Sequence, residues 1–537
     1  MDRRSFIGIS GAGMLGAMAG SALNLNGQET APAELSLGES GEGRGSLHKR
    51  PNIVLFMPDE MRADALACYD NPVTKTPNFD RLASQGTRFA NCHVQFPVCG
   101  ASRCSLLTGW PTSVRGHRSL FYFLRPDEPN LFRYLKQSGY DVFWFGKNDA
   151  LAAQSFYDSV TYWDRGSSHE RPTHPITPNI TSMLHGKGGD RRDDLDYSIV
   201  RSAIEIIERK ESDRPFCLFL PMQGSHPPYT TPADFYSMYS PDSVGKLVPP
   251  DLPKKPDYQK EMRQHYNLDR MTDHQLREVR AVYYGKVSYS DWLMGEVLEA
   301  LEKNGRDKDT AVMLFSDHGD YAGDYGLTEK WPSGLEDCLT HVPLIMRVPG
   351  GKSGHTVNEM TELYDVMATC LGLAGVQAKH THFARDLAPQ LNGEAGDAGR
   401  AAFAEGGYNI YEPQCFEPIT KSVNEYSPKV TLENKMPETV NRSAMVRTRT
   451  HKLIWRSQGQ KELYDIAADP GEQQNLAGKP ELAAVERQLL LRVQQDWDPV
   501  AINAAVHRSQ QRRAIMATAE KGTHNADERR RMGAIGG

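Results

Sequence analysis

A run of eleven residues at 99–109 combines a nucleophile with groups that could hold an anion. It reads Cys99-Gly-Ala-Ser-Arg-Cys-Ser-Leu-Leu-Thr-Gly109, which predicts a turn opening into a short helix. A helix start carries unpaired backbone N–H groups and a positive dipole end, and Arg103 adds a fixed charge one turn in. The run therefore predicts a site where an oxyanion is held beside a nucleophile.

Charged side chains also follow the apolar segments that we expect to be buried strands. Strands predicted at 52–57, 141–145, 216–220 and 311–315 alternate with helices predicted at 131–139, 197–210 and 282–303. This alternation favours an α/β fold with a mostly parallel central sheet sandwiched by helices. Ligand sites of such sheets lie beyond the carboxyl ends of the strands. We expect the residues just past these ends to meet there: Asp59, Glu60, Lys147, His226, Asp317 and His318.

The acidic members of this set predict a metal ion. Asp59 and Asp317 are 258 positions apart, yet both follow apolar strands. Carboxylates gathered at one edge repel each other unless a cation neutralises them. An oxygen-rich set with one imidazole, that of His318, favours Ca²⁺, with Mg²⁺ or Mn²⁺ as alternatives. A helix-capping role would explain Asp59 alone, but it fits the Asp317-His318 pair poorly.

The chain resembles the type I sulfatases of the alkaline phosphatase superfamily. Residues 99–109 match their signature, Cys-x-Pro-Ser-Arg-x-x-x-Leu-Thr-Gly, except that Ala101 replaces proline. Further segments resemble the family in the expected order: 51–60, 76–83, 86–89, 316–319, 326–330, 341–345 and 462–471. The resemblance implies that a maturase oxidises Cys99 to formylglycine, whose hydrated aldehyde attacks sulfur.

The resemblance also assigns roles to individual residues. Asp59, Asp317 and His318 would bind the metal, with Glu60 as a fourth ligand. Arg103 would hold the attacking oxygen, and the clamp on the sulfate oxygens would come from Lys147 and Lys330. His226, in Ser-His-Pro-Pro-Tyr229, would protonate the departing alkoxide.

Three positions depart from the family pattern. Besides Ala101, Glu60 stands where aspartate is common, and Asp149 stands where histidine is usual in Gly-Lys-x-His. Asp149 could be the base that deprotonates the second hydroxyl of the hydrated aldehyde. The alternatives for that role are His93 and His117.

These features lead us to expect a sulfatase that acts on sulfated carbohydrates. A phosphonate or phosphate ester hydrolase of the same superfamily is the main alternative, although His318 is the only histidine expected at the metal. An inactive sulfatase-like binding protein is a third hypothesis. The formal net charge of −6 over 537 residues gives no reason to expect a nucleic-acid partner.

The ends of the chain predict export and a two-part mature protein. Arg3-Arg4-Ser-Phe-Ile7 and the weakly apolar stretch after it resemble a twin-arginine signal over 1–22, too glycine-rich for stable membrane insertion. We expect a periplasmic or extracellular protein with a disordered linker at 23–50, a catalytic α/β domain at 51–375, an α+β subdomain at 376–500 that is irregular over 376–443, and a polar tail at 501–537. The eight cysteines lack zinc-like pairs, and Cys217 and Cys370 are expected to be packed thiols.

Overall fold

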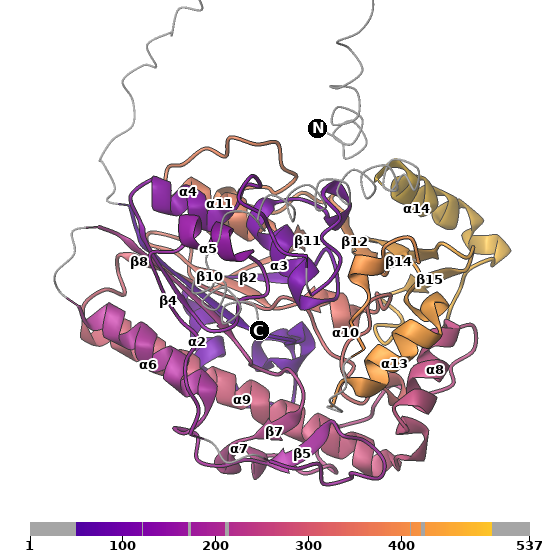
Figure 1. Cartoon of the computed structure of the whole chain (residues 1–537). Helices are drawn as coiled ribbons and strands as arrows, with labels where there is room; N and C mark the ends of the chain where they lie inside the picture. Colours follow the sequence, from indigo (N-terminus) through magenta and orange to yellow (C-terminus); the bar gives the residue numbers. More distant parts are fainter. Residues whose placement is uncertain are drawn as a thin grey trace, which may run out of the picture.

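The computed structural model describes residues 50–496, apart from 121, 170–172, 210–213, 409 and 420–424. Within this part, helices surround a large sheet, and a smaller sheet is formed by the C-terminal third of the chain (Figure 1). The predicted export signal, nearly all of the predicted linker and the predicted tail lie outside the described residues. No helix among the described residues has the length and apolar character needed to span a membrane.

The large sheet is mostly parallel, as predicted. Strand β10 (Leu344–Arg347) runs antiparallel to both of its neighbours, and the short β9 (His341–Val342) pairs antiparallel with β2. The remaining neighbours are parallel. In spatial order the sheet contains β11 (His355–Glu362), β2 (Thr87–His93), β10, β8 (Thr310–Phe315), β1 (Asn52–Pro58), β6 (Phe216–Met222), β3 (Asp141–Phe145) and β4 (Tyr162–Asp164).

The central strands are buried on both faces, and their side chains alternate between two cores. In β1, Val54 and Phe56 belong to one core, whereas Ile53, Leu55 and Met57 belong to the other. The first core is covered by α2 (Pro77–Gln85), α6 (Leu195–Glu208) and α9 (Asp273–Lys303). The second is covered by α3 (Cys99–Thr108), α4 (Leu131–Gln137), α5 (Ala153–Ser159) and α11 (Asp365–Leu373).

The smaller sheet is antiparallel, and a helix covers it. It contains β12 (Ala402–Gly406), β13 (Ser443–Arg447), β14 (His451–Arg456) and β15 (Lys461–Asp465), with α14 (Ala483–Asp496) packed on it. Other short elements include α7 (Ala233–Tyr236), α8 (Asp257–His265), α10 (Asp337–Thr340) and a parallel pair, β5 (Leu184–Lys187) with β7 (Tyr229–Thr231).

Two expectations about these elements were wrong. Helix α9 begins at Asp273, nine residues before the predicted start, because Thr272 and Gln275 form a capping box around its first turn. The segment 376–443, expected to be irregular, contains β12, α12 (Ala388–Leu391) and α13 (Ser427–Lys435). These elements are short, and tertiary contacts rather than a strong periodic pattern hold them.

Candidate active site

Cys99 is the first residue of α3 and lies at the carboxyl edge of the sheet. The extended backbone of Val98 precedes it, and every residue of α3 is buried. A β-carbon at Gly100 would lie 2.6 Å from the carbonyl oxygen of Ser119, so this close approach requires glycine.

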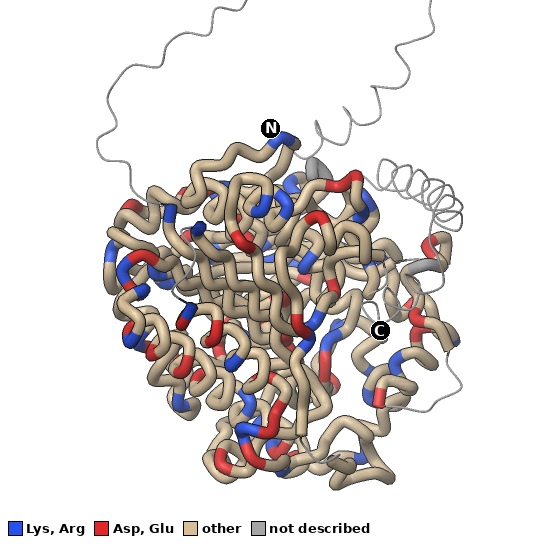
Figure 2. Tube along the Cα trace, turned by 60° about the vertical axis from the view of Figure 1, so that its left-hand side comes forward, with Lys and Arg blue, Asp and Glu red and all other residues tan. Residues whose placement is uncertain are grey.

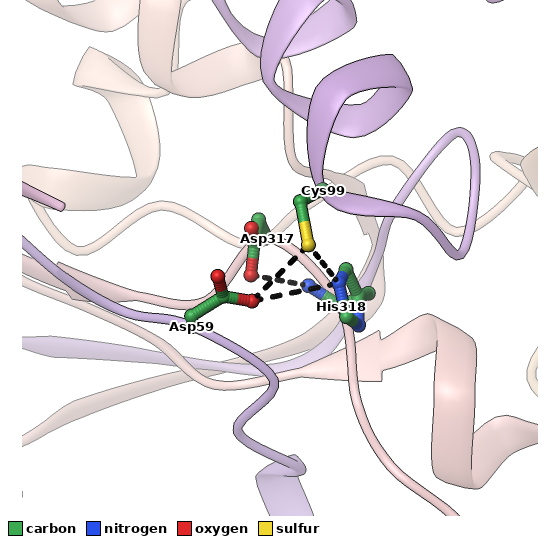
Figure 3. Close-up of side chains that lie close together, drawn as sticks. All are labelled: Asp59, Cys99, Asp317 and His318. Atoms are coloured by element: carbon green, nitrogen blue, oxygen red, sulfur yellow. Dashed lines mark hydrogen bonds and ion pairs between the residues drawn. The ribbon is translucent and has the colours of Figure 1, made fainter. Parts of the chain in front are cut away.

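Three side chains, those of Asp59, Asp317 and His318, gather around the Cys99 sulfur (Figure 3). Ligand atoms of Asp59, Cys99, Asp317 and His318 all lie within 4.8 Å of one another. The sulfur lies 3.1 Å from His318 Nε2 and 3.4 Å from Asp59 Oδ1. His318 Nδ1 is 2.9 Å from the carbonyl oxygen of Gly319, so in the neutral ring it carries the proton and the Nε2 lone pair faces the cluster. Two carboxylates and one imidazole in this arrangement fit a hard divalent cation.

Arg103 joins the two carboxylates of this cluster. Its Nε donates to Asp317 at 2.8 Å and its Nη2 donates to Asp59 at 2.9 Å, while all three side chains are fully buried. Burial alone would raise the pKa of Asp59, but Lys147 and Arg103 lower it well below its usual range. Asp59 is therefore held as the carboxylate, the form that binds a cation.

Lys147 and Asp149 lie beside Asp59, as the strand-end pattern predicted for Lys147. Lys147 Nζ is 3.0 Å from Asp59 Oδ2 and 2.9 Å from Asp149 Oδ2. Burial opposes ionisation, yet Asp149 and Asp59 raise the pKa of Lys147 well above its ordinary value. Asp149 also lies 3.8 Å from Arg103 Nη1, so it sits between two cations of the site.

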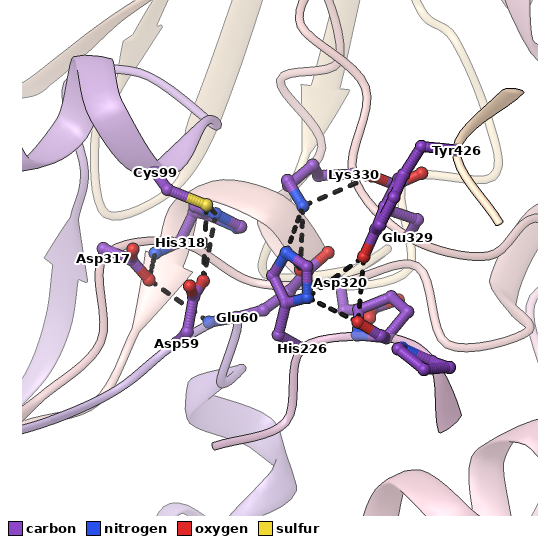
Figure 4. A network of polar contacts seen from close by, with 12 residues as sticks. Asp59, Glu60, Cys99, His226, Asp317, His318, Asp320, Glu329, Lys330 and Tyr426 are labelled. Carbon is purple, nitrogen blue, oxygen red and sulfur yellow. Dashed lines mark hydrogen bonds and ion pairs between the residues drawn. The ribbon is translucent and has the colours of Figure 1, made fainter. Parts of the chain in front are cut away.

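Lys330 connects Glu60 with His226. Figure 4 shows these side chains on the side of Asp59 away from Asp317. Its Nζ donates to Glu60 Oε2 at 3.0 Å and to Glu329 Oε1 at 3.3 Å, and lies 3.1 Å from His226 Nε2. Despite burial, Glu60 raises the pKa of Lys330 well above its ordinary value. Ligand atoms of Glu60, Asp59 and His226 form a second group that could hold an ion, distinct from the cluster around Cys99, and Glu60 Oε1 is buried without a hydrogen-bond partner.

A pocket of about 350 Å³ opens beside His226 and Lys147. Burial, together with the charges of Lys330 and Lys147, lowers the pKa of His226 well below its usual value. Its ring is therefore neutral while the two lysines face it. The pocket wall includes Asp194, Lys286, Tyr289 and Tyr426.

Several residues that support this site were missed from the sequence. The Tyr283 hydroxyl donates to the carbonyl of Glu60, whose backbone is left-handed with φ of 64°. The Tyr229 hydroxyl donates to Asp320 at 2.8 Å and accepts from the backbone N–H of Glu329 at 2.7 Å, next to Lys330. Tyr229 and Asp320 lie next to sequence motifs of the site, so their supporting roles could have been predicted. Tyr283 lies in the middle of a helix, where the sequence does not distinguish it.

The two histidines considered as alternative bases lie in other clusters. His93 stacks on His341 with ring centres 5.1 Å apart, where β2 pairs with β9. His117 lies between the carbonyl of Tyr122, at 2.7 Å, and Glu128, at 3.2 Å. Both therefore have structural partners, whereas Asp149 is ion-paired with the site lysine.

The fold and the site together define an α/β protein with a buried cluster of carboxylates and basic side chains around a cysteine at the carboxyl edge of the sheet. Comparison with known proteins identifies its family. The sulfatase family profile matches residues 51–376. The chain belongs to the sulfatase family and is a sulfuric ester hydrolase, as the signature at 99–109 predicted.

Individual relatives are distant but cover most of the chain. An arylsulfatase of Clostridium perfringens is 24% identical, covering 80% of this chain and 91% of the relative. An N-acetylglucosamine-6-O-sulfatase of Bacteroides thetaiotaomicron is also 24% identical, covering 85% and 88%. Among solved structures, a phosphonate monoester hydrolase of Agrobacterium radiobacter is similar in fold, with a TM-score of 0.68 and 22% identity over 83% of this chain and 96% of that one.

Proposed function

We propose that this protein is an exported, metal-dependent sulfatase that hydrolyses sulfate esters of carbohydrates through a formylglycine formed from Cys99. The observation that carries the proposal is the position of Cys99 at the start of α3, in contact with Asp59 and His318 and one turn ahead of Arg103. The similarity to an N-acetylglucosamine-6-O-sulfatase supports a sugar substrate.

Asp59, Asp317 and His318 are the residues that would hold the cation, Ca²⁺ by preference, with Mg²⁺ or Mn²⁺ as alternatives. When bound, the cation supplies Lewis acidity to the nucleophile and to the sulfate oxygens. A hydrated aldehyde formed at residue 99 would supply the oxygen that attacks sulfur. We assign Glu60 to Lys330, its partner at 3.0 Å, rather than to the ion.

The remaining residues bind the sulfate group and move protons. Lys147 and Lys330, each held by carboxylates, hold the sulfate oxygens, where negative charge develops. The bound sulfate then offsets the two positive charges that depress the pKa of His226, so that His226 Nε2 can carry a proton to the leaving alkoxide. Asp149 is the proposed base for release of sulfate.

Export and domain organisation belong to the same proposal. The twin-arginine pattern at 1–22 supports secretion to the periplasm or beyond, after a formylglycine-forming maturase has acted on Cys99. The catalytic domain at 51–375 and the subdomain at 376–500 remain predicted boundaries.

The decisive experiment is the mass of the tryptic peptide that carries Cys99, from protein purified out of its native host. The aldehyde mass is expected. An intact thiol would overturn the formylglycine proposal and would favour an inactive binding protein instead.

A phosphonate or phosphate ester hydrolase is the second candidate, favoured by the similarity of fold to the Agrobacterium radiobacter enzyme. Rates on the sulfate and phosphate esters of one alcohol separate the two candidates. A faster sulfate ester is expected, and a faster phosphate ester would reverse the order.

A further inference from the structure

Tyr426 brings a residue from the C-terminal part of the chain to the site, 200 positions from His226. It precedes α13 directly and lines the pocket beside His226. We infer that Tyr426 is a positioning residue that fixes the His226 ring for proton delivery and forms a wall of the pocket that takes the leaving alcohol. This inference rests on the proposed function.

The hydrogen bonds around the His226 ring fix where its proton lies. His226 Nδ1 is 2.6 Å from the carbonyl oxygen of Pro227, which can only accept, so Nδ1 carries a proton. The Tyr426 hydroxyl donates to the same carbonyl at 2.9 Å, which leaves its oxygen to accept from His226 Nδ1 at 3.2 Å. The other ring nitrogen, Nε2, is thereby directed toward Lys330.

Tyr426 and Lys286 hold His226 from two sides. The centres of the His226 and Tyr426 rings lie 6.0 Å apart, with the ring planes at 52°. Figure 4 shows the two side chains next to each other. Lys286 Nζ donates to the backbone carbonyls of His226 at 2.7 Å and Pro228 at 3.2 Å. The lysine fixes the backbone, while the tyrosine fixes the ring.

The pocket geometry connects this support to the leaving group. The pocket is bounded by Lys147, His226, Lys286, Tyr289 and Tyr426, and its volume lies in the range of small-molecule sites. A sulfate ester held by Lys147 would have its alcohol in this pocket, next to His226. Tyr426 therefore matters most for alcohols that cannot leave without a proton.

The test compares two substrates that differ in this need. A 4-nitrophenolate leaves unprotonated, whereas the alkoxide of N-acetylglucosamine 6-sulfate requires a proton. For Tyr426→Phe we expect kcat on the sugar sulfate to fall about tenfold, consistent with one lost hydrogen bond to a charged ring. We expect KM for both substrates and kcat on 4-nitrophenyl sulfate to stay within about twofold of wild type. Tyr157→Phe, at an exposed tyrosine of α5, is the matched control and should change neither.

The outcomes separate this inference from the proposed function. If Tyr426→Phe lowers kcat equally on both substrates, or on neither, the positioning role is overturned. Activity retained on 4-nitrophenyl sulfate shows that the variant has folded. His226→Ala should show the same selectivity, about a hundredfold or more on the sugar sulfate. If His226→Ala lacks selectivity, the acid assignment and this inference both fail. A wild-type enzyme inactive on both esters would overturn the proposed function itself.

Discussion

Replacing Glu60 by glutamine separates two roles for the first acidic motif, metal binding and the support of Lys330. The substitution keeps the size of the side chain but removes the charge that faces Lys330 Nζ at 3.0 Å. Glu60 is fully buried, and the ligand atoms around Cys99 form a cluster without it. We therefore expect Glu60→Gln to bind the metal ion normally and to lose activity.

The expected loss follows from the contacts of Lys330. A buried hydrogen bond between charged groups contributes about 1.5–3 kcal/mol. Lys330 keeps a second carboxylate, Glu329 at 3.3 Å, so we take about 2 kcal/mol, or about thirtyfold in kcat. Glu329→Gln, which removes the longer contact, is the matched control and should cost less than Glu60→Gln.

The assay measures metal and activity in the same preparations. Wild type, Glu60→Gln and Asp317→Asn are stripped with a chelator and titrated with Ca²⁺, and both the bound metal and the rise in melting temperature are recorded. Asp317→Asn should weaken metal binding by more than about a hundredfold, the upper end of the loss for outer partners of a metal. If Glu60→Gln loses metal as Asp317→Asn does, Glu60 is a ligand and our assignment is wrong.

Three further predictions address the base, the packing of α3 and a buried acid. Asp149→Asn should release a burst of alcohol equal to the enzyme and then turn over about a hundredfold more slowly, in rapid-mixing kinetics, and a slow rate without a burst would place the base elsewhere. Gly100→Ala should lower stability by about 1–3 kcal/mol in thermal unfolding because its β-carbon meets the Ser119 carbonyl; an unchanged melting temperature would contradict that contact. Burial raises the pKa of Glu433 to about 8, so protonated Glu433 stabilises the fold fully below about pH 4.5 and this contribution is lost as the pH rises through about 8. In melts at pH 5 to 9, Glu433→Gln should lose less stability with rising pH than wild type, and parallel curves would show that Glu433 does not carry this dependence.

The sequence predicted the site better than it predicted the surroundings of the site. Asp59, Lys147, His226 and Asp317 each follow an apolar strand, and the carboxyl ends of parallel strands share one edge, so their meeting follows from the fold class. Tyr426 could not be placed in this way, because it follows no strand and precedes a short helix in a segment without clear periodicity. The sequence also did not indicate that β10 runs antiparallel to its neighbours, since an apolar run has the same pattern in a parallel and in an antiparallel strand.

The start of α9 shows a different kind of omission. Thr272 and Gln275 carry the spacing of a capping box, which is readable from sequence, but the polar first turns that follow hide the apolar stripe. Local signals of this kind mark the ends of elements, whereas the hydrophobic pattern marks only the part that is buried.

The charge balance of the site indicates which anions it prefers. Basic and acidic residues are interspersed along the chain in Figure 2, in keeping with the net charge of −6. At the site itself, the cations Arg103, Lys147 and Lys330 are ion-paired with five carboxylates, those of Asp59, Glu60, Asp149, Asp317 and Glu329. With all of these groups ionised, three positive charges against five negative ones leave two negative charges, which one divalent cation would neutralise.

A site of zero net charge in a buried setting suits a substrate with one negative charge better than a substrate with two, because each extra charge must be desolvated without a partner. Sulfate esters and phosphonate monoesters are monoanions, whereas phosphate monoesters are dianions near pH 8. Among the esters of one alcohol, we expect kcat/KM to be highest for the sulfate ester, as the proposed function requires, and to fall most steeply from the methylphosphonate to the phosphate monoester, which carries the extra charge. Removing the Asp149 charge should narrow the difference in KM between the two phosphorus esters. We compare KM so that the charge effect is separated from the loss of a base. A phosphate monoester that outperforms the phosphonate in wild type would show that charge balance does not set the preference.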